Sequence, residues 1–497
     1  MSIDTALLTL SATGLAASIR ERRVSAAEVV DAHIAAVEAF NPRLNAVVST
    51  RFDEARREAR AADELAASTP ADELPPLHGV PFTVKESIWL TGMPNTSGLV
   101  SRRDHRAASD ATAVARWRAA GAIPLGVTNV SELCMWMESN NAVWGRSNNP
   151  YDATRIVGGS SGGEGSIIGS GASPFGIGAD VGGSIRMPAF FNGVFGHKPT
   201  PGIIPNTGQY PHAEGEAGRY LCTGPLCRRA EDLTPLIRLA AGPDQVDPFT
   251  RPFSLPDPDL SLLRGMRVIL ITTNHLRRPS DPLVASMRRA ADVLAAEGAD
   301  VREVSLKSLR ASFSLWSGLM SAASETSFAS HMGGGPEVSP WVELARLFVG
   351  RSNHTLPAII LAIAEGLPGI DTADAAPLKQ RAAEVRAELL EQMGPGGVIL
   401  YPPYTRTAPR HREPLLTPLD FLYTALWNVL EFPVTQVPLG LDERGLPLGV
   451  QVVGAPYEDH RTITVALALE QALGGWVPPW VAASGSGRPR TVLQLAH

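Results

Sequence analysis

The chain has 497 residues, 44% of them hydrophobic and 19% charged, and a formal net charge of -6. Acidic and basic residues are interspersed along it, which excludes the clustered basic face of a nucleic-acid-binding protein. The three cysteines, Cys134, Cys222 and Cys227, have neither metal-ligand spacing nor an even number for disulfide pairing. We therefore expect free thiols, no metal and a cytoplasmic location.

The amino terminus has no targeting signature. Residues 1–6 lack the basic start and the apolar region of a signal peptide. No stretch reaches the roughly 18 consecutive apolar residues that span a bilayer. The sequence therefore predicts no stable insertion into a membrane.

A helix is predicted near the start of the chain. Ser25 and Glu28 have the spacing of a capping box, in which hydroxyl and carboxylate each satisfy an unpaired backbone N–H. Apolar residues follow at helical spacing, and Asn41-Pro42 is expected to end the helix. We expect residues 1–70 to form a helical arm.

From about residue 79 onward, short apolar runs alternate with helical patterns. The expected strands are residues 79–85, 122–128, 172–180, 267–273, 301–306, 398–401, 433–439 and 446–453. The expected helices are residues 110–120, 282–297 and 460–473. This alternation predicts an α/β fold, with a mixed, largely parallel central sheet covered by helices on both faces.

Residues 306–393 depart from this alternation. Their pattern is helical with few strand signals, so we expect a helical cap inserted into the α/β body. Its two apolar runs, residues 344–349 and 356–363, are expected to form part of the wall of an apolar tunnel or groove.

Two glycine-flanked serine clusters are the features of the sequence that indicate catalysis. Residues 158–165 contain Ser160 and Ser161, and residues 180–186 contain Ser184. Glycine permits positive φ and lets other groups approach the main chain closely. A serine in such a turn can present its hydroxyl to a substrate beside backbone N–H groups, as acyl transfer requires.

Lys85 ends the apolar run 79–85, upstream of both serine clusters. An unpaired ammonium there is costly, so Lys85 either pairs with Glu86 or Asp180 or loses its proton. Burial can lower a lysine pKa by about 3–5 units. A neutral Lys85 would have a free lone pair and could act as a general base.

A rival interpretation starts from the first cluster. Residues 158–162 also satisfy the G-x-S-x-G pattern of α/β-hydrolases, which would make Ser160 the nucleophile and require His411 or His460 as the base. A phosphate-binding loop is disfavoured, because neither cluster ends in Gly-Lys-Ser/Thr.

Longer motifs resemble the amidase signature family. Residues 158–165 followed by 180–188 are similar to its signature, and residues 84–85 to its catalytic-lysine motif. Further matching stretches are residues 132–136, 145–150, 195–199, 432–440 and 445–451. The resemblance covers nearly the whole chain and is greatest to the second type of fatty acid amide hydrolase. It implies a single amidase-signature domain over residues 1–497.

The resemblance implies a Ser-Ser-Lys triad. In it Ser184 would be the nucleophile, Lys85 the base, and Ser160 the bridging serine, preceded by a cis peptide. Ser161 would assist by hydrogen bonding. The oxyanion hole would be formed by consecutive backbone N–H groups, those of Val181, Gly182, Gly183 and Ser184. Asp180 and Arg186 would orient this loop rather than carry protons.

Four residues are expected to bind substrate, because they border the acyl pocket in the family: Cys134, Met135, Trp136 and Met137. Core packing is the expected role of at least one of them. The resemblance thus implies an amidase that cleaves a hydrophobic acyl or aryl amide through an acyl-serine intermediate, without a cofactor. A homodimer is compatible with this interpretation.

Three alternatives remain open at this point. One is hydrolysis of carbamates or aryl amides. Another is an amidotransferase subunit of the same family, whose glutaminase activity feeds ammonia to a partner enzyme. The third is a non-catalytic binding protein on this fold, which the intact lysine and serines argue against.

Overall fold

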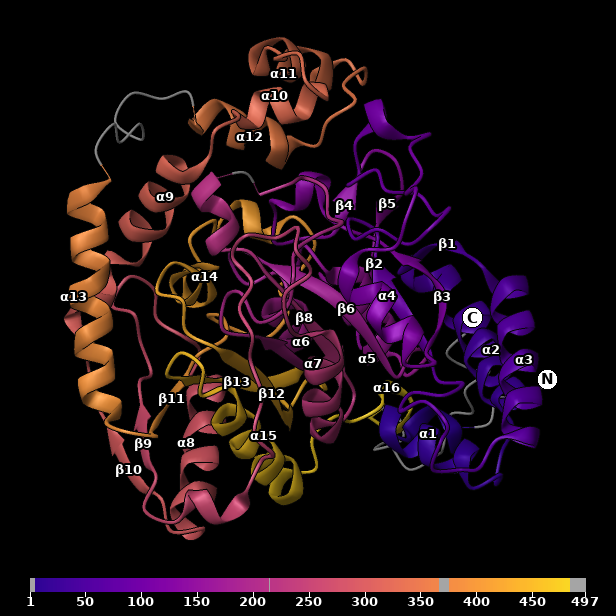
Figure 1. The fold of residues 1–497 in the computed structure, drawn as a ribbon. Helices are drawn as coiled ribbons and strands as arrows, with labels where there is room; N and C mark the ends of the chain where they lie inside the picture. Colours follow the sequence, from indigo (N-terminus) through magenta and orange to yellow (C-terminus); the bar gives the residue numbers. More distant parts are fainter. Residues whose placement is uncertain (1–4, 214, 366–374, 483–497) are drawn as a thin grey trace.

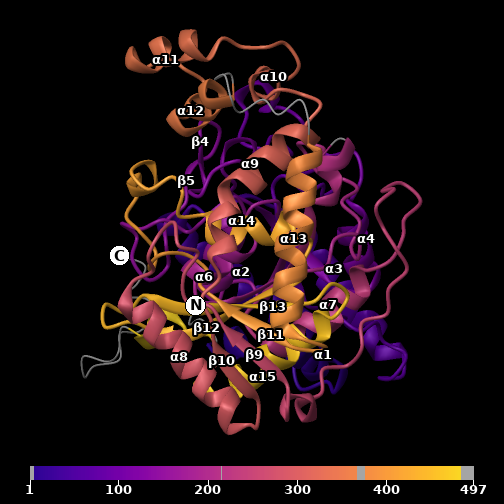
Figure 2. The same ribbon diagram turned by 90° about the vertical axis from the view of Figure 1, so that its left-hand side faces the viewer.

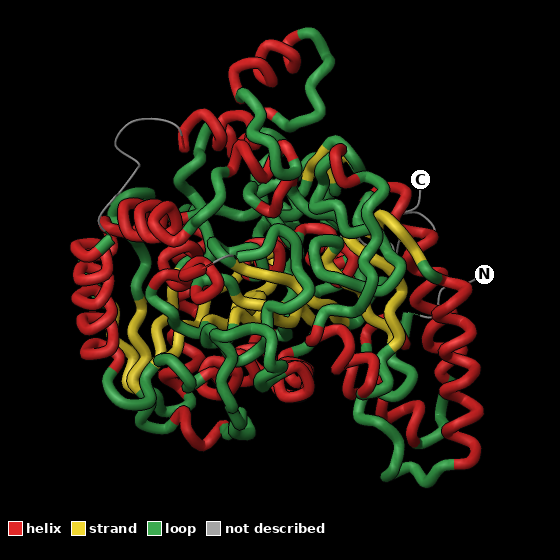
Figure 3. The backbone as a smooth tube through the Cα atoms, turned by 45° about the horizontal axis from the view of Figure 1, so that its top comes forward, coloured by secondary structure: helices red, strands yellow, loops and turns green. Residues whose placement is uncertain are grey.

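A mixed β-sheet runs through the middle of the molecule, with helices on both of its faces (Figures 1 and 3). The computed structural model describes residues 5–213, 215–365 and 375–482, so part of the amino-terminal stretch 1–6 lies outside it. The sheet strands are β1 (Val47–Thr50), β2 (Pro81–Lys85), β3 (Ile123–Thr128), β6 (Phe175–Asp180), β7 (Phe195–Lys198), β8 (Cys222–Cys227), β9 (Arg267–Leu270), β10 (Asp300–Glu303), β11 (Val398–Tyr401), β12 (Val434–Leu441) and β13 (Pro447–Gly454). Their order is β1-β3-β2-β6-β8-β7-β12-β13-β11-β9-β10.

The α/β class and the mixed sheet are confirmed, but parallel pairing does not predominate. The parallel pairs are β2–β3, β2–β6, β9–β10 and β9–β11, and all other neighbours in this sheet are antiparallel. Connection length is one reason. Only residues 442–446 separate β12 from β13, whereas a parallel crossover needs about a dozen residues.

Helices α1 (Ala12–Arg20), α2 (Ala26–Leu44) and α3 (Phe52–Ser68) occupy the amino-terminal segment. The predicted capping box is present: Ser25 N donates to Glu28 Oε2 at 2.8 Å, and Glu28 N donates to Ser25 Oγ at 3.1 Å. The expected end of the helix at Asn41-Pro42 is wrong by one turn. Pro42 fits inside the last turn, and the helix ends at Leu44 before the left-handed Asn45.

The sequence missed strand β8, which lies between β6 and β7. Its sequence contains Gly224-Pro225, and proline is normally excluded from central strands because it lacks a backbone N–H. The structure tolerates Pro225 because the ladder to β7 covers only Leu226 and Cys227. Pro225 itself pairs with Ile177 on the β6 side.

The described residues between β10 and β11 form helices joined by loops, without a strand. Figure 2 shows α10, α11 and α12 together at one end of the molecule, with α9 and α13 beside the body. These helices are α9 (Ser312–Ala323), α10 (Phe328–Gly333), α11 (Pro340–Phe348), α12 (Leu356–Glu365) and α13 (Ala376–Met393). Phe348 and Val349 are 84% and 67% exposed, so the run 344–349 does not as a whole line an interior.

The remaining helices cover the sheet. They are α4 (Thr112–Ala119), α5 (Gly162–Gly169), α6 (Arg186–Phe191), α7 (Leu233–Ala240), α8 (Asp281–Ala296), α14 (Leu422–Val429), α15 (Asp459–Leu473) and α16 (Pro479–Ala482). None of the helices in the described residues combines the length and hydropathy that crossing a bilayer requires.

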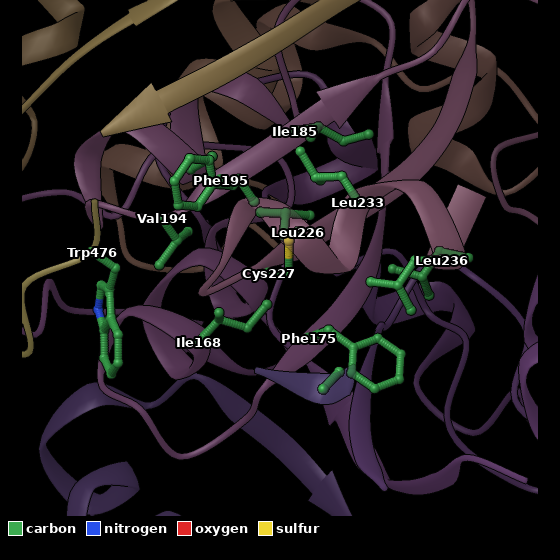
Figure 4. Close-up of a cluster of buried hydrophobic side chains, with 14 of the residues drawn as sticks. Ile168, Phe175, Ile185, Val194, Phe195, Leu226, Cys227, Leu233, Leu236 and Trp476 are labelled. Carbon is green, nitrogen blue, oxygen red and sulfur yellow. The ribbon is translucent and has the colours of Figure 1, made fainter. Parts of the chain in front are cut away.

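A buried apolar cluster supports the elements that carry the two serine clusters. In Figure 4, Phe175 of β6, Leu226 of β8 and Ile168 of α5 pack together with Ile185, which follows Ser184. Burying each such side chain contributes about 1.5–3 kcal/mol. The backbone on both sides of Ser184, and helix α5 after Ser160, are therefore held by the core.

Candidate active site

Lys85 and the two serine clusters meet at one edge of the sheet. Strands β2 and β6 are parallel, so their carboxyl ends, Lys85 and Asp180, lie on the same side. Open α/β sheets bind ligands at this edge. Lys85 Nζ lies 2.7 Å from Ser160 Oγ, and the backbone N–H of Ser161 donates to the carbonyl oxygen of Ser184 at 3.2 Å. The fold thus brings together residues that are far apart in the sequence.

The peptide bond before Ser160 is cis, as the resemblance implied. Gly159 is closely packed against the segment that carries Trp136. A Cβ atom at position 159 would lie 2.1 Å from the carbonyl oxygen of Trp136, so only glycine fits there. This close approach places the expected substrate-binding segment directly beside Ser160.

Lys85 forms no ion pair with a carboxylate of the described residues. Its side chain is buried, and no salt bridge joins it to any residue in the described ranges. Of the two carboxylates expected as partners, Glu86 accepts the N–H groups of Thr96 and Ser97, and Asp180 pairs with Arg186. Burial lowers the pKa of Lys85, against smaller opposing effects from Cys134 and Asp180. Burial thus stabilises the neutral form of Lys85 relative to a lysine in water.

A third carboxyl group, that of Glu164, lies close to Lys85. It accepts hydrogen bonds from Thr83 Oγ1 at 2.7 Å and from Thr128 Oγ1 at 2.9 Å. Burial raises the pKa of Glu164 to about 8, and Lys85 only partly opposes this. A mostly protonated Glu164 at neutral pH leaves Lys85 without a counter-charge on this side.

Hydrogen bonds to the carbonyl groups of residues 180–183 hold the loop of residues 181–184 in place. The carbonyl oxygens of Asp180, Val181, Gly182 and Gly183 accept hydrogen bonds from Asn428 Nδ2 (2.9 Å), Trp316 Nε1 (3.0 Å), Thr424 Oγ1 (2.7 Å) and the backbone N–H of Met187 (2.8 Å), respectively. In a trans peptide the N–H group points away from the carbonyl. These contacts therefore set the directions of the four following N–H groups.

One of those N–H groups is already occupied. Gly183 N donates to Asp180 Oδ1 at 2.7 Å. The N–H groups of Val181, Gly182 and Ser184 have no acceptor among the residues that the structure describes. Of the four N–H groups that the sequence predicts for an oxyanion hole, three are therefore available to a ligand, and that of Gly183 is engaged within the loop.

Asp180 and Arg186 form a fully buried ion pair at the base of this loop. Arg186 contacts both carboxylate oxygens, at 2.9 and 3.0 Å, and its remaining N–H groups donate to Thr424 O, Gln451 Oε1 and Asn428 Oδ1. Burial raises the pKa of Asp180, but Arg186 and the loop N–H groups outweigh it and hold that pKa well below its usual range.

Replacing Asp180 with asparagine should lower the free energy of unfolding by about 3–5 kcal/mol, because it leaves Arg186 buried without its counter-charge. Urea denaturation measures the change. Since the pKa of Asp180 is lowered on folding, its contribution is present above its ordinary pKa and is lost as pH falls. The deficit should therefore shrink below about pH 4.

Asp257→Asn is the matched control. Asp257 pairs with Arg238 at 2.7 Å but is 85% exposed, so its replacement should change the unfolding free energy by less than about 1 kcal/mol. Equal effects of the two substitutions would contradict a structural role for the buried pair.

The expected substrate-binding residues separate into two groups. Cys134, Met135 and Trp136 are partly exposed near Ser160, whereas Met137 is buried in the core with its sulfur 3.5 Å from Tyr404 Oη. Met137 is therefore a packing residue, a role that the sequence expected for at least one of the four.

Two histidines fix the ends of this segment. His354 Nδ1 lies 2.6 Å from Glu132 Oε1, and His411 Nδ1 lies 2.6 Å from Glu138 Oε1. His411 thus binds Glu138 and, through its other ring nitrogen, the carbonyl of Ala153. The α/β-hydrolase interpretation needs a histidine at Ser160, and that position is taken by Lys85.

Three residues of the site were missed by sequence reasoning: Trp316, Thr424 and Asn428. Each lies on a helix as an ordinary aromatic or polar residue, without a local motif. Only their positions against residues 180–182 distinguish them. No group of three histidine, cysteine or carboxylate side chains in the described residues is arranged to hold a metal ion.

Comparison with known proteins gives one consistent result. The sequence model of the family named Amidase matches residues 28–463. The chain is 44% identical to fatty-acid amide hydrolase 2 of Homo sapiens, covering 95% of this chain and 91% of that protein. It is 46% identical to fatty-acid amide hydrolase 2-A of Danio rerio, covering 96% and 91%. A bacterial aryl acylamidase of the amidase signature family superposes with a TM-score of 0.79 at 23% identity, covering 97% of this chain and 99% of that one.

Proposed function

Because this chain belongs to the amidase signature family and is an amide-hydrolysing enzyme, we propose that Ser184, Ser160 and Lys85 are its catalytic triad. The observation that carries the proposal is the 2.7 Å contact of Lys85 Nζ with Ser160 Oγ, in a buried setting without an acidic partner for the lysine. An amine in that setting is a base rather than an ion-pair member.

The reaction starts with proton transfer. Neutral Lys85 accepts the proton of Ser160 Oγ, and Ser160 accepts the proton of Ser184 Oγ as that oxygen attacks the amide carbonyl. The C–N bond then breaks, and the proton returns through Ser160 to the departing amine nitrogen. The product is an acyl ester on Ser184, which water hydrolyses by the same relay.

The negative charge that develops on the carbonyl oxygen needs fixed donors. We propose the N–H groups of Val181, Gly182 and Ser184 for this role, since Gly183 N already donates to Asp180. One such donor contributes about 2.7–4 kcal/mol to transition-state stabilisation in other hydrolases. Ser161 assists by tying its own backbone to that of Ser184.

A hydrophobic acyl amide is the proposed substrate. Met135 and Trp136 offer apolar, partly exposed surface beside Ser160, and the chain is 44–46% identical to proteins named fatty-acid amide hydrolase 2. Residues 306–393 are proposed to act as a cap over this site. A homodimer and a cytoplasmic location remain predictions from the sequence.

Amides graded by acyl length test the substrate proposal. Each added CH₂ buried in the site contributes about 0.8 kcal/mol, so kcat/KM should rise about fourfold per methylene until the pocket is filled. Steady-state kinetics with one constant amine measures this. Equal rates at all acyl lengths, together with strong dependence on an aryl amine, would instead favour an aryl-amide hydrolase. Efficient glutamine hydrolysis would favour the amidotransferase alternative.

A further inference from the structure

Trp316 of helix α9 contacts the 181–184 loop and packs against the buried apolar cluster beside it. Its indole N–H donates to the carbonyl oxygen of Val181 at 3.0 Å. A Cβ atom on Gly182 would lie 3.3 Å from the indole ring, so the ring lies directly against this glycine. Phe421 packs edge-on against Trp316, with ring centroids 4.9 Å apart, and holds the indole in place.

This contact controls one donor of the proposed oxyanion hole. The carbonyl of Val181 and the N–H of Gly182 belong to the same planar peptide and point in opposite directions. Glycine at position 182 adds no side chain to restrict its own backbone. The hydrogen bond from Trp316 is thus what fixes the direction of the Gly182 N–H.

The other peptides of the loop are held from the main body of the enzyme. Asn428 and Thr424 on α14 bind the carbonyls of Asp180 and Gly182, and Met187 N at the start of α6 binds that of Gly183. The Val181–Gly182 peptide alone is held by a residue from the helical segment between β10 and β11 within the described chain.

We propose that Trp316 is a positioning residue for amide hydrolysis, which aims the Gly182 N–H at the substrate carbonyl oxygen. Through it, helix α9 is coupled to transition-state stabilisation. This inference rests on the proposed function, in which Gly182 N–H is an oxyanion donor. The inference gives helix α9, which carries Trp316, a role in catalysis.

Trp316→Phe tests the proposal, because it keeps an aromatic ring against Gly182 and Phe421 but removes the N–H donor. Complete loss of one oxyanion donor lowers kcat about 10²–10³-fold, and a misdirected donor should lower it less. We expect kcat to fall about tenfold with KM changed less than about twofold, expressed per active site titrated with a fluorophosphonate. Trp341→Phe is the control, since Trp341 is 63% exposed on α11 and should leave kcat unchanged.

A thioamide substrate separates positioning from a general structural defect. Sulfur accepts hydrogen bonds more weakly than oxygen, so weakening an oxyanion donor should reduce the amide-to-thioamide ratio of kcat in Trp316→Phe. A general distortion of the site would instead lower kcat equally for both substrates and leave the ratio unchanged. An unchanged ratio would overturn the proposal, and so would a wild-type kcat for the amide. Loss of activity in Ser184→Ala beside an unaffected Trp316→Phe would leave the proposed function standing and reject only the role of Trp316.

Discussion

Ser184→Ala is expected to lower kcat for amide hydrolysis by about 10⁴-fold or more, and to abolish covalent labelling by a fluorophosphonate. The reason is that in the proposed mechanism the acyl ester forms on Ser184 Oγ, at the end of the loop that carries the proposed oxyanion donors. Mass spectrometry of the labelled protein identifies the modified serine, and steady-state kinetics gives the residual rate.

Ser160→Ala provides the comparison for this experiment. In the proposed mechanism Ser160 transfers protons and is not the attacking group, so its loss should lower kcat about 10²–10⁴-fold and leave slow labelling of Ser184. The assignment of Ser184 would be wrong if Ser184→Ala retained labelling and Ser160→Ala lost it. That pattern would restore Ser160 as the nucleophile.

Lys85→Met should lower kcat/KM by about 10²–10⁴-fold and remove the pH dependence that the base imposes. In the unmodified enzyme only neutral Lys85 accepts a proton. Since burial lowers the pKa of Lys85, kcat/KM should rise with pH through that lowered pKa and then become constant. The rise should be absent in Lys85→Met.

The same substitution should increase stability. In the pH range between the lowered pKa and the ordinary value of 10.5, the unfolded chain binds more protons at Lys85 than the folded one. Folding there is opposed by this deprotonation, and the penalty grows as pH falls. Methionine removes the penalty, so the free energy of unfolding in urea should rise, most at low pH.

Lys379→Met is the matched control for both measurements. Lys379 lies on α13 with its side chain 56% exposed and pairs loosely with Glu216 at 3.8 Å. Its replacement should change neither kcat/KM nor stability measurably. A lower stability for Lys85→Met than for this control would show that Lys85 is charged in the folded enzyme and would contradict its role as a base.

Local sequence patterns predicted most elements of the sheet, because short apolar runs and capping residues act over a few neighbouring positions. Strands β2, β3, β11, β12 and β13 lie where expected. The pairing direction of strands depends on connections and neighbours instead. The error over parallel pairing, and the omission of β8 with its Pro225, both come from interactions that no local pattern records.

The candidate site also combines features that the local sequence predicts with features that depend on the folded structure. Residues 158–165 and 180–186 and the lysine at the end of an apolar run could be recognised because glycine, serine and lysine carry their chemistry in the residue type itself. Neither the missing acidic partner of Lys85 nor the occupied N–H of Gly183 could be predicted this way. The first depends on where the fold places Arg186 against Asp180, and the second on the conformation of the loop that follows Asp180.

The sequence by itself thus determined the family and the reaction class, and it predicted the residues that we propose as the catalytic triad. The tertiary structure decided which groups around them are free to act. Trp316 is 135 residues from Val181 in the chain, and Asn428 is 242 residues from Arg186. Contacts at that separation exist only after the sheet has assembled, because no local backbone preference brings such residues together.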